Sequence, residues 1–191
     1  MNLKGKKVLL RSIEEEDIEN LRKLANDPWY ESMIVGWALP ISKKDQKEWF
    51  SNYKISSNQI RLIIETEEDG MVGMTGLNAI DWKNGVAQAG GMRIIKKDLR
   101  TKGIATDAYM TLFKYAFEEL RLNRIEGSVL VYNIASIKTT QKVGFKQEGI
   151  RREAVFKKGK YHDVINLGII KKDYLEKRQE LGYEEEGLIN E

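Results

Sequence analysis

A single long helix, predicted for residues 101–120, limits the folds open to this chain more than any other segment. Its small and apolar side chains recur at near-helical spacing, at Ala105, Ala108, Leu112, Ala116 and Leu120. Such a stripe must be buried against another layer of structure. Because the flanking segments read as strands, we expect a mixed α/β domain built around one sheet.

The strands are predicted from alternating or apolar runs, and the EEDG and WKNG sequences between three of them are hairpin signals. The expected strands cover 6–13, 60–66, 71–80, 86–95, 124–131, 144–159 and 161–170. Further helices are expected at 18–25, 43–53 and 133–143, and a charged helical tail follows the last strand. Ser12 and Ser42 are the predicted N-caps of the first two helices.

Two scarce residue types exclude several kinds of chemistry. The chain has no cysteine, which excludes disulfides, thiolate metal sites and a cysteine nucleophile. It has one histidine, His162, which disfavours histidine triads and most zinc catalysis, so we expect no metal. No apolar run is long enough to span a membrane, and no signal peptide is evident. We expect a cytoplasmic protein without a membrane partner.

The charge is modest in total but unevenly distributed. The net charge of +3 is too small to indicate direct nucleic-acid binding. Residues 93–102 carry five basic side chains and one acidic, whereas residues 176–191 carry six acidic and two basic. The acidic tail is most simply a solvated helix end, with a homodimer contact as the alternative.

The basic segment contains a glycine turn at the mouth of the long helix. The first amides of a helix have no intrahelical partner, and with the helix dipole they form a natural anion site. Gly103 allows close backbone approach, while Arg100 and Lys102 add positive charge. The alternative is a solvated basic turn in which the glycine serves only the geometry.

Three segments resemble one family. RTKGIA (100–105) resembles the R/Q-x-x-G-x-G/A signature of the GNAT superfamily of acyl-CoA-dependent N-acyltransferases. NIASIKTTQKVGF (133–145) and GKYHDVINLGII (159–170) resemble its Rim-type branch, the RimJ/RimL-like enzymes that acetylate ribosomal-protein N-termini. The resemblance implies a single mixed, mostly antiparallel sheet flanked by helices. It also implies a GNAT domain over residues 1–175, followed by an acidic helical tail over 176–191.

The resemblance implies acetyl-CoA as co-substrate. The glycines at 90–91 are the expected site of a bulge that splays two strands and frees backbone groups for the pantetheine arm. Simple steric fit is the alternative for both glycines, and an ordinary N-cap is the alternative for Asn133. The expected cofactor-binding residues are Met92, Arg93, Ile94, Arg100, Thr101, Lys102, Gly103, Ile104, Ala105, Thr106, Asn133 and Ser136.

In the family mechanism a neutral amine attacks the thioester directly. The resemblance implies that a backbone N–H near Met92–Ile94 binds the thioester oxygen and that Ser136 donates a hydrogen bond to the leaving sulfur. A first-turn serine that bonds the backbone is the alternative for Ser136. Many relatives use a tyrosine four residues later, where this chain has Thr140, so Tyr132 is the other candidate acid.

The general base is unassigned, because the expected strand glutamate is missing and only Gln88 stands in that segment. This favours an acceptor that is already partly neutral. About a tenth of an α-amino group is neutral at pH 7, against about 0.04% of an alkyl ammonium. A protein or peptide N-terminus, such as that of a ribosomal protein, is therefore favoured over a polyamine or amino sugar.

The acceptor is expected to contact the irregular segment 27–50 and the turn at 156–162. The expected substrate-binding residues are Trp29, Tyr30, Trp37, Gln88 and His162. The alternatives are core packing for the aromatic residues, including Trp49 and Phe50, and a structural histidine beside Asp163 for His162. Two other functions stay open: a non-catalytic acyl-CoA sensor, and association with RNA or with the ribosome, although no recognised RNA-binding motif is present.

Overall fold

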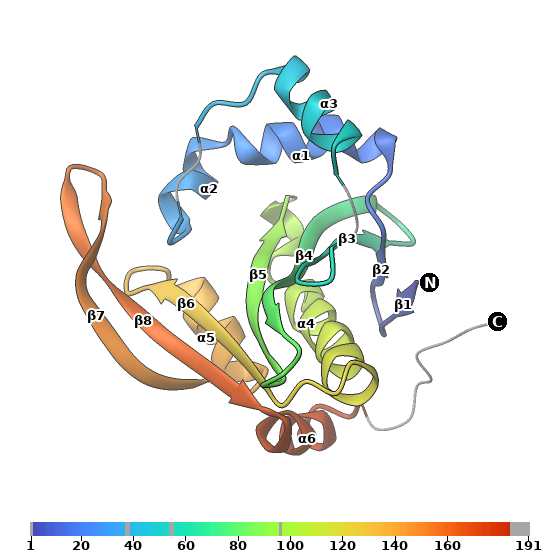
Figure 1. Ribbon diagram of the computed structural model, residues 1–191, viewed down its shortest axis with the longest axis vertical. Helices are drawn as coiled ribbons and strands as arrows, with labels where there is room; N and C mark the ends of the chain where they lie inside the picture. Colours follow the sequence, from blue (N-terminus) through green and yellow to red (C-terminus); the bar gives the residue numbers. More distant parts are fainter. Residues whose placement is uncertain (1, 37–38, 54–55, 96, 184–191) are drawn as a thin grey trace.

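The computed structural model describes residues 2–36, 39–53, 56–95 and 97–183, and within these ranges one sheet runs through the molecule (Figure 1). Its strand order is β1-β2-β3-β4-β5-β6-β8-β7. Only β5 and β6 pair in parallel, and the other neighbours are antiparallel. The predicted mixed, mostly antiparallel sheet is confirmed. The strands are β1 (Leu3–Lys4), β2 (Leu9–Arg11), β3 (Ile60–Thr66), β4 (Gly70–Asp81), β5 (Val86–Ile94), β6 (Arg124–Leu130), β7 (Lys146–Lys157) and β8 (Lys160–Ile170).

The helices form two groups, with α1, α2 and α3 at the top of Figure 1 and α4, α5 and α6 below them. The α-helices are α1 (Ile18–Ala25), α2 (Pro28–Met33), α3 (Lys43–Ser51), α4 (Ile104–Lys114), α5 (Ile134–Lys142) and α6 (Lys171–Glu180). Short 3-10 turns are η1 (Glu15–Asp17) and η2 (Lys97–Leu99), and a π-helical turn, η3 (Tyr115–Glu119), extends α4. Within the described ranges, no helix is both long and apolar enough to cross a membrane.

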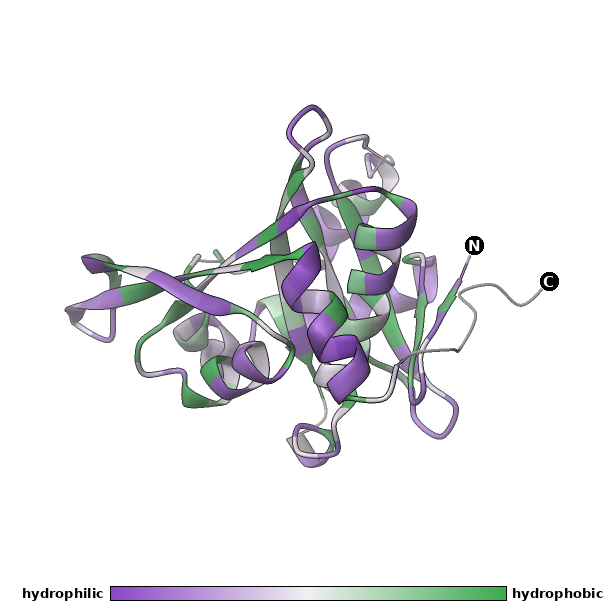
Figure 2. Cartoon of the chain, turned by 90° about the horizontal axis from the view of Figure 1, so that it is seen from below, coloured by the Kyte–Doolittle hydropathy of each residue, from purple (hydrophilic) through white to green (hydrophobic). Residues whose placement is uncertain are grey.

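Each group of helices covers its own hydrophobic core. The larger core contains the predicted stripe of α4, with Ala108, Leu112 and Ala116 fully buried. The smaller core joins Leu21 of α1 to Ile63 of β3, with Trp49 and Phe50 of α3 packed against it. Hydrophobic and hydrophilic bands alternate along the strands (Figure 2), as expected where the two faces of a sheet meet different surroundings.

The structure corrects several predicted boundaries. The first strand is shorter than 6–13, and β1 was not predicted. Glu14 rather than Ser12 precedes the first helical turn, and its N–H donates to the Asp17 carboxylate at 2.9 Å. The predicted Ser42 cap is confirmed, because its hydroxyl accepts from the Asp45 N–H at 3.1 Å.

The helix α2 was missed because Pro28 was interpreted only as the end of α1. Proline is also well suited to the first turn of a new helix. Here it opens α2, and the Asp27 carboxylate caps that helix by accepting from the Trp29 N–H at 2.8 Å.

The strands β5 and β6 separate after a short paired region. Their register joins only 86–88 to 124–126, although both strands continue further. The pairing of β4 with β5 slips at the same level: Met74 faces Arg93, and Gly76 faces Gly90. Two residues of β5, Gly91 and Met92, therefore lie opposite the single residue between Met74 and Gly76, and Gly91 has φ +65°, which favours glycine. The bulge and the splay predicted at 90–91 are therefore confirmed.

Both ends of the described chain are fastened to α4 by Asp107, which is buried in its first turn. Its carboxylate accepts from the backbone N–H groups of Lys6, Lys7 and Val8 at 2.6–3.1 Å and from the Tyr183 hydroxyl at 2.8 Å. The helix α6 crosses the predicted boundary at residue 175, and residues 184–191 of the predicted tail lie outside the described ranges.

Candidate active site

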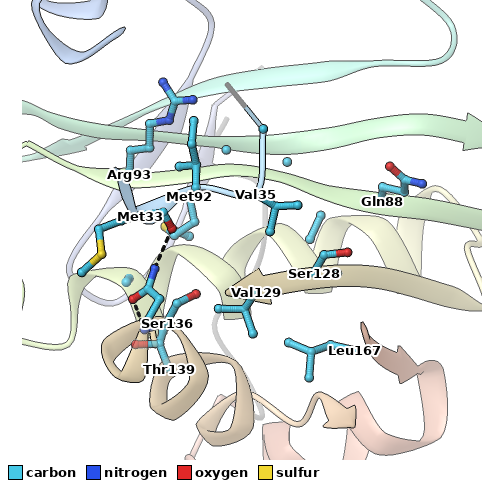
Figure 3. A pocket seen from close by; sticks show the side chains of 18 of the residues that line it. Met33, Val35, Gln88, Met92, Arg93, Ser128, Val129, Ser136, Thr139 and Leu167 are labelled. Atoms are coloured by element: carbon cyan, nitrogen blue, oxygen red, sulfur yellow. Dashed lines mark hydrogen bonds between the residues drawn. The ribbon is translucent and has the colours of Figure 1, made fainter. Parts of the chain in front are cut away.

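A cavity of about 1020 Å³ opens where β5 and β6 diverge. Its walls come from α2 and the residues that follow it, from both diverging strands, from α4 and α5, and from β7 and β8. Figure 3 shows Ser136 and Thr139 of α5 on one side and Arg93 on the other. One wall of the cavity is therefore formed by α4 and α5, and the wall on the other side is formed by α2.

The exposed edge of β5 forms the first wall. Beyond Gln88 no described strand pairs with this edge, so its backbone groups are available to a ligand, except the Ile94 carbonyl, which accepts hydrogen bonds from Tyr30 and Arg100. Met92, Arg93 and Ile94 all line the cavity, as does Gly90. A Cβ atom on Gly90 would collide with the Asn78 side-chain amide, so a larger residue here would require that amide to move.

The glycine turn lies at the start of α4. Gly103 is the N-cap residue with φ +83°, and no side chain caps the helix. The first amides of α4 are therefore not used by a side chain of the described chain. Lys7 reaches this turn from the N-terminal segment, where its Nζ donates to the Lys102 carbonyl at 2.9 Å.

Only part of the predicted cofactor loop borders the cavity. Arg100 and Ala105 line it, whereas Thr101, Lys102, Gly103, Ile104 and Thr106 are not among its lining residues. The side chain of Ile104 is buried in the larger core, so only its backbone is able to meet a ligand.

The start of α5 forms the opposite wall. Asn133 is the N-cap: its side-chain oxygen accepts from the Ser136 N–H at 3.2 Å. Its amide nitrogen donates to the Met33 carbonyl at 2.9 Å, which fastens the end of α2 to α5. Ser136 lines the cavity, and the alternative acid position, Thr140, is buried with its hydroxyl donating to the carbonyls of Ser136 and Ile137.

Tyr132 and His162 point elsewhere, and neither lines the cavity. The Tyr132 hydroxyl donates to the Ser32 carbonyl, and burial raises the pKa of this phenol. The two rings pack edge to face with centroids 4.7 Å apart, and His162 Nε2 lies 3.1 Å from the Lys157 carbonyl. Hydrogen bonds to Ser32 and Lys157 hold the two side chains away from the lining of the cavity, and their roles as acid and substrate contact stay predictions.

The α2 wall contains two of the predicted aromatic residues. Trp29 is 42% exposed and Tyr30 is buried, and both line the cavity. The Tyr30 hydroxyl donates to the Ile94 carbonyl, and burial raises the pKa of the phenol. The Arg100 guanidinium lies 4.1 Å from the centroid of Trp29 and donates to the Tyr30 hydroxyl at 3.2 Å. Trp37 lies outside the described residues.

The floor contains charged residues that sequence reasoning missed. Gln88 lies next to Glu126 in the last parallel pair of β5 and β6. Glu126 pairs with Arg124 at 2.9 Å, and Arg124 also binds Glu148 of β7. This hydrogen bond lowers the pKa of Glu148. The alternation of Arg124 and Glu126 along a predicted strand was the available signal, because it puts both on one face.

Comparison with known proteins gives consistent results. A family model described as "Acetyltransferase (GNAT) domain" matches residues 7–146. The "Uncharacterized N-acetyltransferase p20" of Bacillus licheniformis is 30% identical over 171 residues, which cover 88% of this chain and 95% of that protein. The "Putative ribosomal N-acetyltransferase YdaF" of Bacillus subtilis is 34% identical over 107 residues, which cover 56% of this chain and 57% of that protein.

Among solved structures, the chain is similar to the spermidine N-acetyltransferase of Vibrio cholerae in complex with CoA and spermine. The TM-score is 0.80 at 23% identity, over 90% of this chain and 99% of that one. At this identity the likeness concerns the fold. Within the described ranges, no group of histidine, aspartate and glutamate side chains is arranged to hold a metal ion.

Proposed function

This chain belongs to the GNAT acetyltransferase family, and we propose that its acceptor is the N-terminal amine of a protein or peptide. The family establishes an N-acetyltransferase that uses acetyl-CoA as co-substrate. A ribosomal protein is the favoured source of the N-terminus, ahead of a polyamine or an amino sugar. Similarity to YdaF, which is named as a ribosomal N-acetyltransferase, supports this preference.

The cavity fits acetyl-CoA on two independent features. The β5 edge beyond Gln88 is free to bind an amide-rich chain, and the first turn of α4 has no side-chain cap. Gly103, the amides that follow it and Lys102 suit the pyrophosphate, and the diverging strands suit the pantetheine arm. When bound, acetyl-CoA supplies the acetyl group as a thioester.

The residues of this chain then have three tasks. A backbone N–H of Met92–Ile94 stabilises the negative charge that develops on the carbonyl oxygen. Ser136 donates a hydrogen bond to the sulfur as the carbon–sulfur bond breaks, and the thiol takes its proton through Ser136 or water. The attacking amine forms the new carbon–nitrogen bond and releases its proton to solvent. No covalent intermediate with the enzyme is required.

The preference for an N-terminus rests chiefly on the state of the two carboxylates in the cavity. Glu126 and Glu148 both bind Arg124, and the pKa of Glu148 is lowered. With its pKa lowered in this way, Glu148 is a weak proton acceptor. An acceptor that is already partly neutral near pH 7 suits such a site, and an α-amino group meets that condition while an alkyl ammonium does not.

An acceptor panel tests the proposal by measuring release of free thiol from acetyl-CoA. Steady release should be fastest with short peptides that have a free N-terminus, and slower with spermidine and glucosamine. Release with spermidine alone would contradict the proposed acceptor. If acetyl-CoA binds but no amine causes release of free thiol, the result would favour the alternative function, a non-catalytic acyl-CoA sensor.

A further inference from the structure

An arginine in the cavity is not accounted for by the binding of acetyl-CoA. Arg93 directly follows the β5 bulge and pairs across the sheet with Met74, a residue that packs against the smaller core beneath α1 and α3. Its neighbours Met92 and Ile94 pack against the larger core on the α4 side. The Arg93 side chain therefore faces the α2 side of the sheet, and Figure 3 shows it directed away from Ser136.

Arg93 is partly buried without a partner for its charge. In the part of the chain that the structure describes, its Nε is buried and forms no hydrogen bond. Burial and the nearby charge of Arg61 lower the pKa of the guanidinium. A buried cation that lacks an anionic partner is unfavourable, and a bound anion offsets that cost.

Two further arginines near Arg93 are occupied by neutral groups only. Arg61 lies over the ring of Trp49, and the Gln59 amide oxygen, once that amide is turned to accept, lies 3.1–3.2 Å from two of its nitrogens. Arg100 donates to the Ile94 carbonyl at 3.3 Å and to the Tyr30 hydroxyl. Among the described residues none of the three arginines forms an ion pair with a carboxylate. Two of them, Arg93 and Arg100, line the cavity, so this wall is positively charged.

The opposite side of the cavity differs. Two arginines line it: Arg124, which is bound by the carboxylates of Glu126 and Glu148, and Arg151, whose Nε donates to the Asn166 side-chain oxygen at 3.1 Å. Two carboxylates accompany the two arginines there, whereas Arg93 has no carboxylate partner among the described residues.

We propose that the amine acceptor carries a carboxylate, which binds to the Arg93 guanidinium beneath α2. A guanidinium presents paired N–H donors that match a carboxylate, which gives both affinity and orientation. The inference rests on the proposed function and narrows it to a peptide with an acidic residue close to its N-terminus. A polyamine would bring positive charge against the same wall.

Equilibrium binding tests the inference without requiring turnover. The probes are alanine-initiated peptide amides with one glutamate at position 2, 3 or 4, and their glutamine counterparts. Each is titrated calorimetrically into the protein saturated with CoA. We expect at least one glutamate peptide to bind about 10- to 100-fold more tightly than its glutamine counterpart, the range for one charge-assisted contact.

Three variants locate the effect. Arg93→Gln should abolish the preference for glutamate, and Arg93→Lys should retain part of it. Arg152→Gln removes the same charge from an exposed position of β7 that does not line the cavity, and it should bind like the wild type. Thermal unfolding verifies that each variant is folded. The expected contact of residue 93 with the cofactor uses its backbone, which no substitution removes, so the affinity for CoA should change little in these variants.

Equal binding of every glutamate and glutamine pair by the wild type would overturn the inference, as would a preference that persists in Arg93→Gln. A large loss of CoA affinity in Arg93→Gln would also overturn it, because the anion would then be a phosphate of CoA. Acetylation of the same peptides is measured separately. A glutamate preference without acetylation of any peptide would leave the carboxylate site intact and refute the proposed function instead.

Discussion

Replacing Gly103 by alanine tests whether the turn before α4 binds the pyrophosphate of coenzyme A. The backbone at Gly103 has φ +83°, a region that residues with a Cβ atom rarely adopt. Space is not the obstacle, because the nearest atom to an added Cβ would be Lys7 Nζ at 3.6 Å. The variant therefore strains the backbone of the turn and leaves the core unchanged.

The expected cost follows from that conformation. An alanine in the left-handed region costs about 1–2 kcal/mol. For a chain of this length each kcal/mol lowers the melting temperature by about 2–4 °C, so a loss of about 2–8 °C is expected. The turn relieves the strain by rotating at residue 103, which redirects the N–H groups that follow. Loss of one or two hydrogen bonds to a charged phosphate corresponds to at least about tenfold weaker binding of CoA.

Gly159 provides a matched control. It has φ +79° in the β7–β8 hairpin, and an added Cβ would meet nothing within 4 Å. Gly159→Ala should lower the melting temperature by a similar amount and leave CoA binding unchanged. Differential scanning calorimetry gives the stabilities, and titration calorimetry with CoA gives the affinities.

The comparison separates strain from ligand contact. If both variants lose similar stability and both bind CoA as the wild type does, the turn before α4 is not the pyrophosphate site. If Gly159→Ala weakens CoA binding as much as Gly103→Ala does, the loss of affinity reflects general destabilisation. That result would also refute the assignment of the turn as the pyrophosphate site.

Three further outcomes are expected. Ser136→Ala should lower kcat by about 10- to 1000-fold with little change in acetyl-CoA affinity. Unchanged turnover would refute the catalytic role of Ser136 and leave it a structural role at the start of α5. Because Arg124 holds both carboxylates among the described residues that line the cavity, kcat/KM should rise with pH through the pKa of the acceptor itself, near 8 for a peptide N-terminus and about 10 for an alkyl amine. A common break below about pH 7.5 for both amines would reveal an enzyme base, and Glu126→Gln would then remove it. Asp107→Ala should destabilise the fold by about 3 kcal/mol or more in urea unfolding, because it leaves the buried Val8 N–H unpaired, and a loss below about 1 kcal/mol would refute that role.

Local patterns predicted most of the fold. The Ser42 cap fixed the start of α3, and the stripe through Ala108 and Leu112 identified the helix that covers the larger core. Gly90 and Gly91 indicated the position of the bulge, because adjacent glycines inside a strand often mark a bulge. In each case the deciding information lies within a few residues of the feature.

The charged parts of the site were harder to predict because their partners come from distant segments. Arg124 meets Glu148 only through the order β6-β8-β7, in which the last two strands exchange their sequence order. Tyr132 follows a strand that lines the cavity, yet a bond to Ser32, a hundred residues away, directs it elsewhere. No local pattern contains either relationship.

Two arginines on adjacent strands show why the fold does not determine the acceptor. Arg124 of β6 holds two carboxylates, which would otherwise be free to bind a cationic amine or to take its proton. Arg93 of β5 holds none among the described residues, and it leaves positive charge on the wall beneath α2. Both features oppose a polycation, although the backbone matches a spermidine acetyltransferase along nearly its whole length. The shared sheet determines where these side chains lie but not which residues they are, and the choice of acceptor depends on the residues. Similarity in fold alone therefore does not support a polyamine substrate.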